Sequence, residues 1–505
     1  MSRLSKNILY NLTGQILLAG LGFVAVKYVF KQLGGDALGI IYFTLALNVT
    51  LSSVLSMGIG ETTVREVSAH FTSEPRYIRD LLRTASWFYW GLYALVAAGL
   101  YFGAPLLVHR WINLKTLDPG TAILVLRVLG IASFSALPRA LYVSILRGLE
   151  RMEFNNVIDV ATSALQQCGT IVVLLYGNGL MSVVYWISAC YGVAIIAYLL
   201  VCARFLSWGA LLPGFSIGVA RRNLSYASRM AMISLFAMIQ MQADKAIVSK
   251  LLPLSLFGLY TVAYSAVSKG SAMTGAVFQG AFPHLSALDA AHDRVGLLSQ
   301  YRKLQDLVCF GTVPLFAAII FLASPLFSFM FKAQGARILV VPVAFLCVGF
   351  YMNGTLNIPY AFSLAVGKPG IAARLNFYAL FCVLPVTVAL VYFFGLPGAG
   401  FSWVFYHLFA YAYGLPRICR ECLQSSAWAW YLHVLKVAAL AAATYGVAWV
   451  VLVATGCNAL LPLAVAYGAA SGLFLLGSFF LIGPELRGSI RVLLRNLRTK
   501  YVEAI

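Results

Sequence analysis

Six basic residues of this sequence lie inside apolar stretches that are long enough to cross a membrane. They are Lys27, Arg127, Arg139, Arg229, Lys245 and Lys269. Lys269 stands out because no other residue between positions 251 and 288 carries a formal charge. A lysine at the centre of a spanning helix costs about 2.5–3.5 kcal/mol on insertion scales, so such a residue usually has a function. A group of interior cations is suited to neutralise an anion, such as a phosphate, inside the membrane.

The helix expected around Lys269 carries a stripe of small and polar residues. Its members are three or four positions apart: Thr261, Ser265, Ser268, Ala272, Gly275 and Gln279. Lys269 follows Ser265 by one turn and lies at the edge of this stripe, so it should point into the protein with the stripe. Such a stripe is also typical of a seam where helices pack, and this interpretation stays open.

Polar residues mark the interior of other predicted helices as well. Asn11 and Gln15 share a face near the N-terminus, and Arg229, Gln240 and Asp244 share a face of a later helix. From these positions and the interior cations we predict a cationic, polar substrate-binding surface. Its candidate residues are Lys269, Arg229, Lys245, Arg139, Arg127, Asn11, Gln15 and Gln240.

Interior acids are fewer than interior cations. We identify Asp159 and Asp244, with Glu61 at a helix boundary. Asp159 lies on a polar stripe with Gln166, and buried carboxylates can change their protonation near neutral pH. Asp159 and Asp244 are therefore the candidates for coupling transport to a proton or a sodium ion. Asp244 can instead form a local ion pair with the adjacent Lys245.

The composition requires a membrane environment for these residues. Apolar residues make up 61% of the 505 positions, charged residues make up 10%, and the mean hydropathy is +0.87. A soluble protein has about 25% charged residues. Apolar stretches of about 20 residues recur along the whole chain, as membrane-spanning helices require. The sequence therefore predicts an all-α polytopic membrane protein.

We expect about fourteen transmembrane helices, separated by the polar breaks between apolar stretches. They cover approximately residues 8–30, 38–60, 82–107, 120–146, 157–176, 180–203, 223–249, 256–282, 304–331, 338–364, 371–394, 397–416, 433–455 and 460–483. The first is expected to be retained, because no obvious small-residue cleavage site precedes its polar end. Lys27 lies close to the end of that helix, so it can also snorkel to the interface.

The loops between these helices divide the remaining basic residues unequally. With the N-terminus in the cytoplasm, the cytoplasmic segments hold 24 Lys and Arg residues and the opposite side holds 6. This asymmetry predicts that both termini are cytoplasmic. The net charge of +20 is then explained by attraction to anionic lipid on that face, and we expect no nucleic-acid partner.

An internal repeat divides the chain. A shift of 219 residues places the first six helices over helices seven to twelve and aligns KQLGGDALG (31–39) with KLLPLSLFG (250–258). Six helices per half give a parallel repeat, the organisation of two-lobed transporters that hold substrate between their lobes. The expected parts are an N-lobe at 1–204, a cytoplasmic linker at 205–222, a C-lobe at 223–420, and two extra helices with a basic cytoplasmic tail at 421–505.

Several chemistries have no support in the sequence. It contains no G-x-x-x-x-G-K-[ST] loop for nucleotide phosphates and no HExxH or paired His/Cys spacing for a metal, so we expect no cofactor. The longest outside loop, at about 108–119, is too short for the catalytic part of a polysaccharide polymerase or ligase. The CxxC at Cys419 and Cys422 has no second pair and is interpreted as structural. We therefore expect a transporter rather than an enzyme.

Short motifs of this chain resemble those of a known family. LGGDALGIIY and MGIGETTVREVSA (33–42 and 57–69) resemble its G-x-x-x-(F/L)-G-x-Y and G-(I/L)-G-x-x-x-x-R-E patterns, and ILRGLERMEFNN (145–156) resembles its cytoplasmic loop. QADKAIVSKLLPLSLFGLYTVA, FQGAFPHLS and LPGAGFSW follow in the family's order. The family is that of the oligosaccharide flippases of polysaccharide biosynthesis, which move O-antigen and exopolysaccharide precursors. The resemblance covers about residues 5–420 and places the chain in the superfamily of multidrug and toxin extruders and lipid II flippases.

The resemblance implies a two-lobed fold of twelve or fourteen helices in the bacterial inner membrane. It implies that the protein moves undecaprenyl-diphosphate-linked oligosaccharide from the cytoplasmic to the periplasmic leaflet, among membrane lipids and beside a polysaccharide polymerase and a chain-length regulator. Two alternatives share the fold. A lipid II flippase carries a similar lipid diphosphate, whereas a multidrug or cation antiporter would need more interior acids than Asp159 and Asp244.

Overall fold

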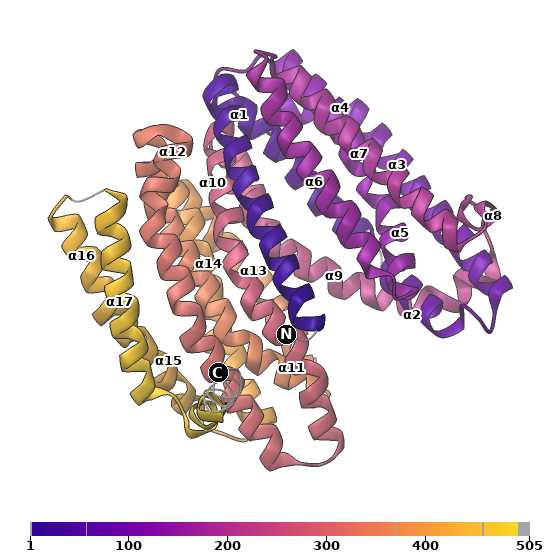
Figure 1. Cartoon of the computed structure of the whole chain (residues 1–505). Coiled ribbons are helices and arrows are strands. Elements are labelled where there is room, and N and C mark those ends of the chain that lie inside the picture. Colours follow the sequence, from indigo (N-terminus) through magenta and orange to yellow (C-terminus); the bar gives the residue numbers. More distant parts are fainter. Residues whose placement is uncertain (1–2, 57, 369, 457–458, 493–505) are drawn as a thin grey trace, which may run out of the picture. The chain divides into compact units, whose positions relative to one another are not determined.

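The computed structural model describes the backbone of residues 3–56, 58–368, 370–456 and 459–492. The side chains of residues 3–16, 225–234, 236, 237, 240, 279, 280 and 283 lie outside this description. Helices make up nearly all of the described chain, which contains no β-strand (Figure 1). The predicted all-α fold is confirmed.

The chain forms two compact units, Met1–Thr261 and Val262–Ile505. The helices of the first unit are α1 (Arg3–Leu55), α2 (Ile59–His70), α3 (Pro75–Arg110), α4 (Pro119–Phe134), α5 (Ala136–Gly148), α6 (Met152–Leu175), α7 (Leu180–Phe205), α8 (Trp208–Leu211) and α9 (Ile217–Leu251). Helix α10 (Leu254–Ser268) crosses the boundary between the units. The lobe boundaries predicted from the repeat remain a prediction.

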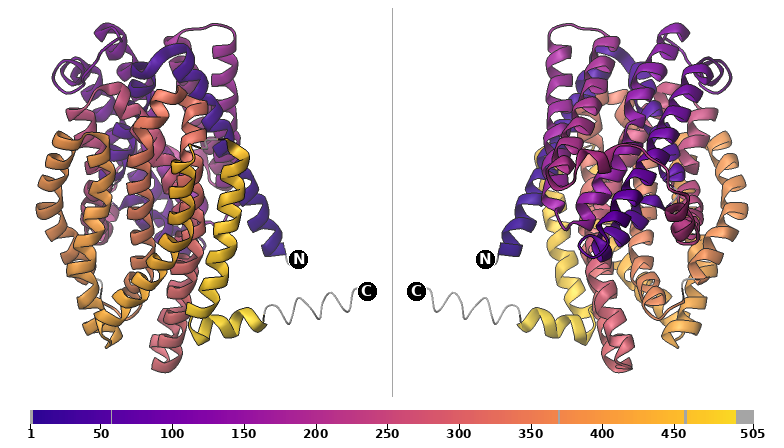
Figure 2. Two further views of the ribbon diagram at one scale, coloured as in Figure 1. Left: turned by 90° about the vertical axis from the view of Figure 1, so that its left-hand side faces the viewer. Right: turned by 90° about the vertical axis from the view of Figure 1, so that its right-hand side faces the viewer.

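The second unit continues with a 3-10 helix, η1 (Lys269–Ser271), and ends on the helices drawn in yellow (Figure 2). Its other helices are α11 (Ala272–Ala290), α12 (Arg294–Ala365), α13 (Gly370–Phe394), α14 (Leu396–Ile418), η2 (Cys419–Leu423), α15 (Ala427–Ala441), η3 (Ala442–Gly446), α16 (Val447–Ala454) and α17 (Leu460–Leu481). The segments η2 and η3 are π-helical turns.

The helices account for the predicted number of spans. Nine of the described segments are long and apolar enough to cross a membrane. Two of these, Leu17–Leu55 and Arg294–Ala365, contain a non-helical residue and so hold two spans each. Helices α9 and α14 and the run of α10, η1 and α11 occupy the positions of the three remaining predicted spans.

Sharp changes of direction occur inside the two double spans. Gly34 has φ 86° and Lys332 has φ 61°, and neither value belongs to an α-helix. Glycine adopts a positive φ at no steric cost, so Gly34 explains the first break. Lys332 also has a positive φ, which is uncommon for a residue other than glycine. It lies in the turn that joins the two spans. The breaks fall in the loops predicted between helices one and two and between helices nine and ten.

Asp306 is a third interior acid, which is missing from the pair predicted from the sequence. It is buried on α12, where one carboxylate oxygen accepts the N–H of Gly483 at 2.7 Å. The other oxygen lies 3.1 Å from Nε2 of His433. His433 is on α15 and Gly483 lies two residues beyond the end of α17, so one carboxylate holds both C-terminal spans against α12.

Candidate functional site

Two glycines cross at very short distance in the first unit. A Cβ added to Gly39 on α1 would lie 2.2 Å from the carbonyl oxygen of Leu254, and one added to Gly258 on α10 would lie 2.9 Å from the Cα of Gly39. Only glycine allows two helix backbones to approach this closely. Gly39 and Gly258 are also the residues that the 219-residue repeat aligns. Contact between equivalent residues is the arrangement expected beside the axis of a parallel repeat.

Loops close the same end of the first unit around this crossing. One carboxylate oxygen of Asp36 accepts the backbone N–H groups of Lys115, Thr116 and Leu117 at 2.9, 2.6 and 3.3 Å. Asp36 is buried, and its hydrogen bonds join the α1 turn to the loop between α3 and α4. The position of Asp36 in the LGGD turn was the signal in the sequence for this role, but Asp36 was not among the predicted site residues.

The loop between α3 and α4 also binds the turn that connects α9 to α10. The side-chain N–H of Asn113 donates to the carbonyl of Lys250 at 2.9 Å. The backbone carbonyl of Asn113 accepts the N–H of Leu254 at 3.0 Å. Nε1 of Trp111 lies 3.1 Å from the hydroxyl of Ser249. We call the contacts of residues 34–39, 110–117 and 249–258 the loop junction.

A buried ion pair lies below the loop junction on α9. Nζ of Lys245 is 3.5 Å from one carboxylate oxygen of Asp244, and both side chains are less than 10% exposed. The hydroxyl of Tyr260 donates to the other oxygen at 2.7 Å. Lys245 also lines a mainly apolar cavity of about 210 Å³ with the aromatic rings of Phe43 and Trp111. The local ion pair left open from the sequence therefore forms, and Asp244 has its charge compensated.

Arg127 makes a contact that explains its place in an apolar helix. Its Nε donates to the carbonyl oxygen of Tyr101 at 2.9 Å, and its guanidinium lies 4.4 Å from the Tyr101 ring centroid. In a helix that carbonyl would accept the N–H of residue 105, but Pro105 has no N–H. Arg127 therefore supplies the hydrogen bond that Pro105 removes. This structural role accounts for the residue without a substrate.

Replacing Arg127 with alanine should lower the stability of the first unit. The Tyr101 carbonyl loses its donor, and an unpaired polar group in a membrane protein costs about 1–3 kcal/mol. The Arg127→Ala change should be much better tolerated with Pro105→Ala, which restores the helical N–H. The free energy of unfolding of the two single variants and the double variant measures this coupling. Normal stability of Arg127→Ala with lost transport would instead support a substrate contact.

Asp159 and Arg139 lie around the same buried tyrosine. The hydroxyl of Tyr198 on α7 donates to Oδ1 of Asp159 at 2.9 Å, and Tyr198 is fully buried. Arg139, half-buried on α5, lies within electrostatic range of Tyr198. Asp159 itself is exposed beside this tyrosine. One candidate coupling acid and one candidate cation are thus brought together in the first unit.

Lys269 lies at a 3-10 turn in its helix. It is the first residue of η1, the 3-10 turn that separates α10 from α11, and its side chain is exposed. A 3-10 turn inside a long helix often marks a hinge or a functional site. Behind it, a Cβ added to Gly270 would lie 2.8 Å from the ring of Phe316, so the turn packs closely on α12. No feature of the sequence predicted this interruption.

The side chains of Asn11, Gln15, Arg229 and Gln240 lie outside the described part of the chain. Among the side chains that are described, no group of three or more His, Cys, Asp or Glu residues could hold a metal ion.

A second charged cluster, which the sequence did not predict, joins α2 to α3 and α9. Glu66 is buried on α2 and accepts hydrogen bonds from Arg65 and, at 2.9 Å, from the hydroxyl of Tyr77. Asn223 on α9 donates to the same hydroxyl at 3.0 Å. Burial opposes ionisation of Glu66, but the hydrogen bonds and the Arg65 charge outweigh it and keep the pKa of this carboxyl below its ordinary value. Glu66 is the acid of the R-E pair in the MGIGETTVREVSA motif.

These helices define a polytopic membrane protein, and solved structures have a similar fold. The lipid II flippase MurJ in an inward closed conformation is similar, with 13% identity, a TM-score of 0.70, and coverage of 94% of this chain and 98% of that one. An inward-facing multidrug resistance transporter of the MATE family in the MOP superfamily is also similar, with 15% identity and a TM-score of 0.67. The match covers 80% of this chain and 94% of that transporter. The Vibrio cholerae MATE transporter VcmN has 16% identity, a TM-score of 0.55, and coverage of 81% and 95%.

A family model identifies the chain more closely than these structures do. The model described as polysaccharide biosynthesis protein matches residues 32–338, more than half of the chain. The chain belongs to this family. No curated protein matches the chain significantly. The resemblance to a family of polysaccharide biosynthesis, drawn from the sequence motifs, is confirmed.

Proposed function

We propose that this protein moves a lipid-diphosphate-linked oligosaccharide, carried on undecaprenol, from the cytoplasmic to the periplasmic leaflet of the bacterial inner membrane. Its membership of the polysaccharide biosynthesis family supports a saccharide cargo. The proposed orientation, with both termini in the cytoplasm, rests on the distribution of Lys and Arg between the loops. O-antigen and exopolysaccharide precursors are the cargo class, and the protein acts without a cofactor and as a transporter rather than an enzyme.

The observation that carries the proposal is the exposed Lys269 at a 3-10 turn within an apolar helix. A diphosphate has two or more negative charges and cannot cross a low-dielectric layer unless they are neutralised. An ammonium group at effective dielectric 20 and 4 Å attracts one unit of negative charge by about 4 kcal/mol. Lys269 would bind the diphosphate, and polar amides and hydroxyls would meet the sugars.

The loop junction supports transport by alternating access. The hydrogen bonds that Asp36 accepts and Asn113 donates, together with the Gly39–Gly258 contact, close one end of the first unit. In the proposed orientation this is the periplasmic end, so the contacts must separate when cargo is released there. Short hydrogen-bonded loops suit such a change, because they can exchange their partners for water.

Vesicle reconstitution tests the proposed cargo. Purified protein is placed in vesicles that contain a fluorescent undecaprenyl-diphosphate oligosaccharide, and an impermeant quencher reports which leaflet holds it. The quencher cannot reach lipid in the leaflet that faces away from it. We expect this unquenched fluorescence to fall faster with the undecaprenyl-diphosphate oligosaccharide than with lipid II or with a fluorescent cation. Faster movement of lipid II would favour the lipid II flippase alternative, and cation movement alone would favour the antiporter. A co-purified polysaccharide polymerase or chain-length regulator would identify the expected partners.

Asp159 is the proposed coupling residue, because Asp244 is already paired with Lys245. Replacing Asp159 with asparagine keeps an acceptor for the Tyr198 hydroxyl but removes the ionisable group. We expect this variant to keep its fold and to lose its response to an imposed proton or sodium gradient, measured by the same quenching assay. An unchanged gradient response would remove Asp159 from the coupling mechanism.

A further inference from the structure

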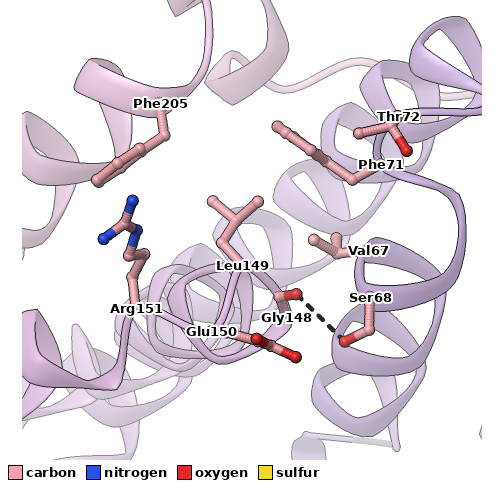
Figure 3. Close-up of a pocket in the computed structure, with 9 residues that line it drawn as sticks. All are labelled: Val67, Ser68, Phe71, Thr72, Gly148, Leu149, Glu150, Arg151 and Phe205. Atoms are coloured by element: carbon pink, nitrogen blue, oxygen red, sulfur yellow. Dashed lines mark hydrogen bonds between the residues drawn. The ribbon is translucent and has the colours of Figure 1, made fainter.

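Two motifs of the sequence meet around a cavity that the proposed transport does not use (Figure 3). The motif at 57–69 contributes Val67 and Ser68 on α2, and the motif at 145–156 contributes the turn from Gly148 to Arg151. The hydroxyl of Ser68 donates to the carbonyl of Gly148 at 3.2 Å and ties the two together. The cavity holds about 350 Å³, within the range of about 300–1,000 Å³ typical of small-molecule sites.

The cavity lies at the level where membrane spans end. One candidate span ends at Gly148, the next begins at Met152, and a third ends at Phe205, which lines the cavity. Met152 and Val157 on α6 are 55% and 66% exposed, so an apolar surface that suits acyl chains adjoins the cavity. A lipid with its chains on α6 would hold its headgroup at the height of the cavity.

Glu150 occupies a backbone position that normally belongs to glycine. The N–H of Arg151 bonds to the carbonyl of Leu146 at 2.8 Å and the N–H of Glu150 to that of Arg147 at 3.0 Å, which together form a Schellman motif. Glu150 has φ 58° in this motif, a left-handed conformation that strains any residue with a Cβ. Strained residues of this kind cluster at ligand sites, so its side chain is a candidate for binding.

The cavity carries opposite charges at two separate places. In Figure 3 the Glu150 carboxylate lies at the Ser68 end, and the Arg151 guanidinium lies at the Phe205 end, on the other side of Leu149. The guanidinium is 5.7 Å from the Phe205 ring centroid. This separation fits a ligand with a cationic and an anionic group in one short headgroup.

We propose that this cavity binds the headgroup of an ethanolamine phospholipid. The primary ammonium donates to Glu150, and the phosphate accepts from Arg151 at the other end of the cavity. Arg151 lies 3.5 Å from Glu153, but both side chains are more than half exposed, and a pair of that kind contributes little and exchanges readily. The site would hold a structural lipid and does not rest on the proposed cargo.

Thermal unfolding of the whole chain in mixed micelles tests the site. Phosphatidylethanolamine should raise Tm by several degrees, because a ligand of the folded state stabilises it by mass action. Phosphatidylglycerol lacks the ammonium and phosphatidylcholine lacks its N–H donors, so both should raise Tm less. Native mass spectrometry should show ethanolamine lipid retained in preference to the other two.

Variants of the turn separate binding from folding. Glu150→Gly removes the backbone strain, so its Tm without lipid should stay level or rise by about 1–2 °C, while the shift caused by the ethanolamine lipid is lost. Arg151→Gln should lose that shift as well. Glu153→Gln and Arg147→Gln, which change charges outside the cavity lining, should keep it. Equal shifts with all three lipids, or a full ethanolamine shift in Glu150→Gly, would overturn the proposal.

Discussion

Replacing Lys269 with glutamate should abolish transport of the lipid-linked oligosaccharide while the protein remains in the membrane. If the ammonium neutralises the diphosphate, its removal costs about 4 kcal/mol of attraction at 4 Å and effective dielectric 20, and the new carboxylate adds repulsion of similar size. Since 1.36 kcal/mol corresponds to a tenfold change in rate, we expect at least a 100-fold loss. The quenching assay in vesicles, corrected for the amount of folded protein, measures it.

Graded variants show whether charge or shape decides the effect. Lys269→Arg should keep part of the transport because both side chains bind phosphate, although the planar guanidinium differs from a point charge. Lys269→Gln should lose most of it. Lys436→Gln, which removes an exposed lysine from α15, is the matched control and should transport normally.

A purely structural lysine would behave differently in a double variant. If Lys269 only compensated an acid, Lys269→Gln would be rescued when that acid was neutralised too, since removing one partner of a buried pair is what destabilises it. Restored polysaccharide export in such a double variant would exclude binding of the diphosphate by Lys269.

The sequence was most informative where the relevant signal is local. Apolar stretches and their polar breaks predicted where the long helices of the described chain lie, because spanning helices must satisfy their backbone groups within themselves. The adjacent residues Asp244 and Lys245 suggested the ion pair that forms. The aligned glycines Gly39 and Gly258 carried information about packing as well, although the alignment alone did not reveal that they touch.

Contacts between distant residues were beyond the same reasoning. Arg127 was predicted to bind substrate, which stays a prediction, and its contact with a carbonyl 26 positions earlier in the chain was not foreseen. Pro105 was the available signal, because a proline in a helix always leaves an acceptor unpaired four residues before it. Asp306 lay within a predicted span and its two partners, His433 and Gly483, are more than 120 positions away. Periodicity within one helix cannot show which partner a buried acid meets.

Replacing Gly39 with alanine should be the most damaging one-carbon change in the first unit. The new Cβ would lie 2.2 Å from the Leu254 carbonyl oxygen, far inside van der Waals contact, and a backbone oxygen cannot rotate away as a side chain can. The two helices must then separate, and overpacking of this kind costs about 1–3 kcal/mol or more. We expect a Tm several degrees lower and greater reactivity of a cysteine introduced at Asn113, because separation of the helices opens the loop junction.

Two further glycine variants make the Gly39 experiment specific. Gly258→Ala places its Cβ 2.9 Å from the Gly39 backbone and should have a smaller effect of the same kind. Gly20→Ala lies on the same helix α1 with no atom within 4 Å of the new Cβ, so it should be neutral or slightly stabilising through its better helix propensity. We therefore expect Gly20→Ala to be the most stable variant, Gly258→Ala to be intermediate and Gly39→Ala to be the least stable. If Gly39→Ala matched Gly20→Ala in stability and in transport, the two helices would not cross at these glycines, and the loop junction would lose its role in closing that end of the transporter.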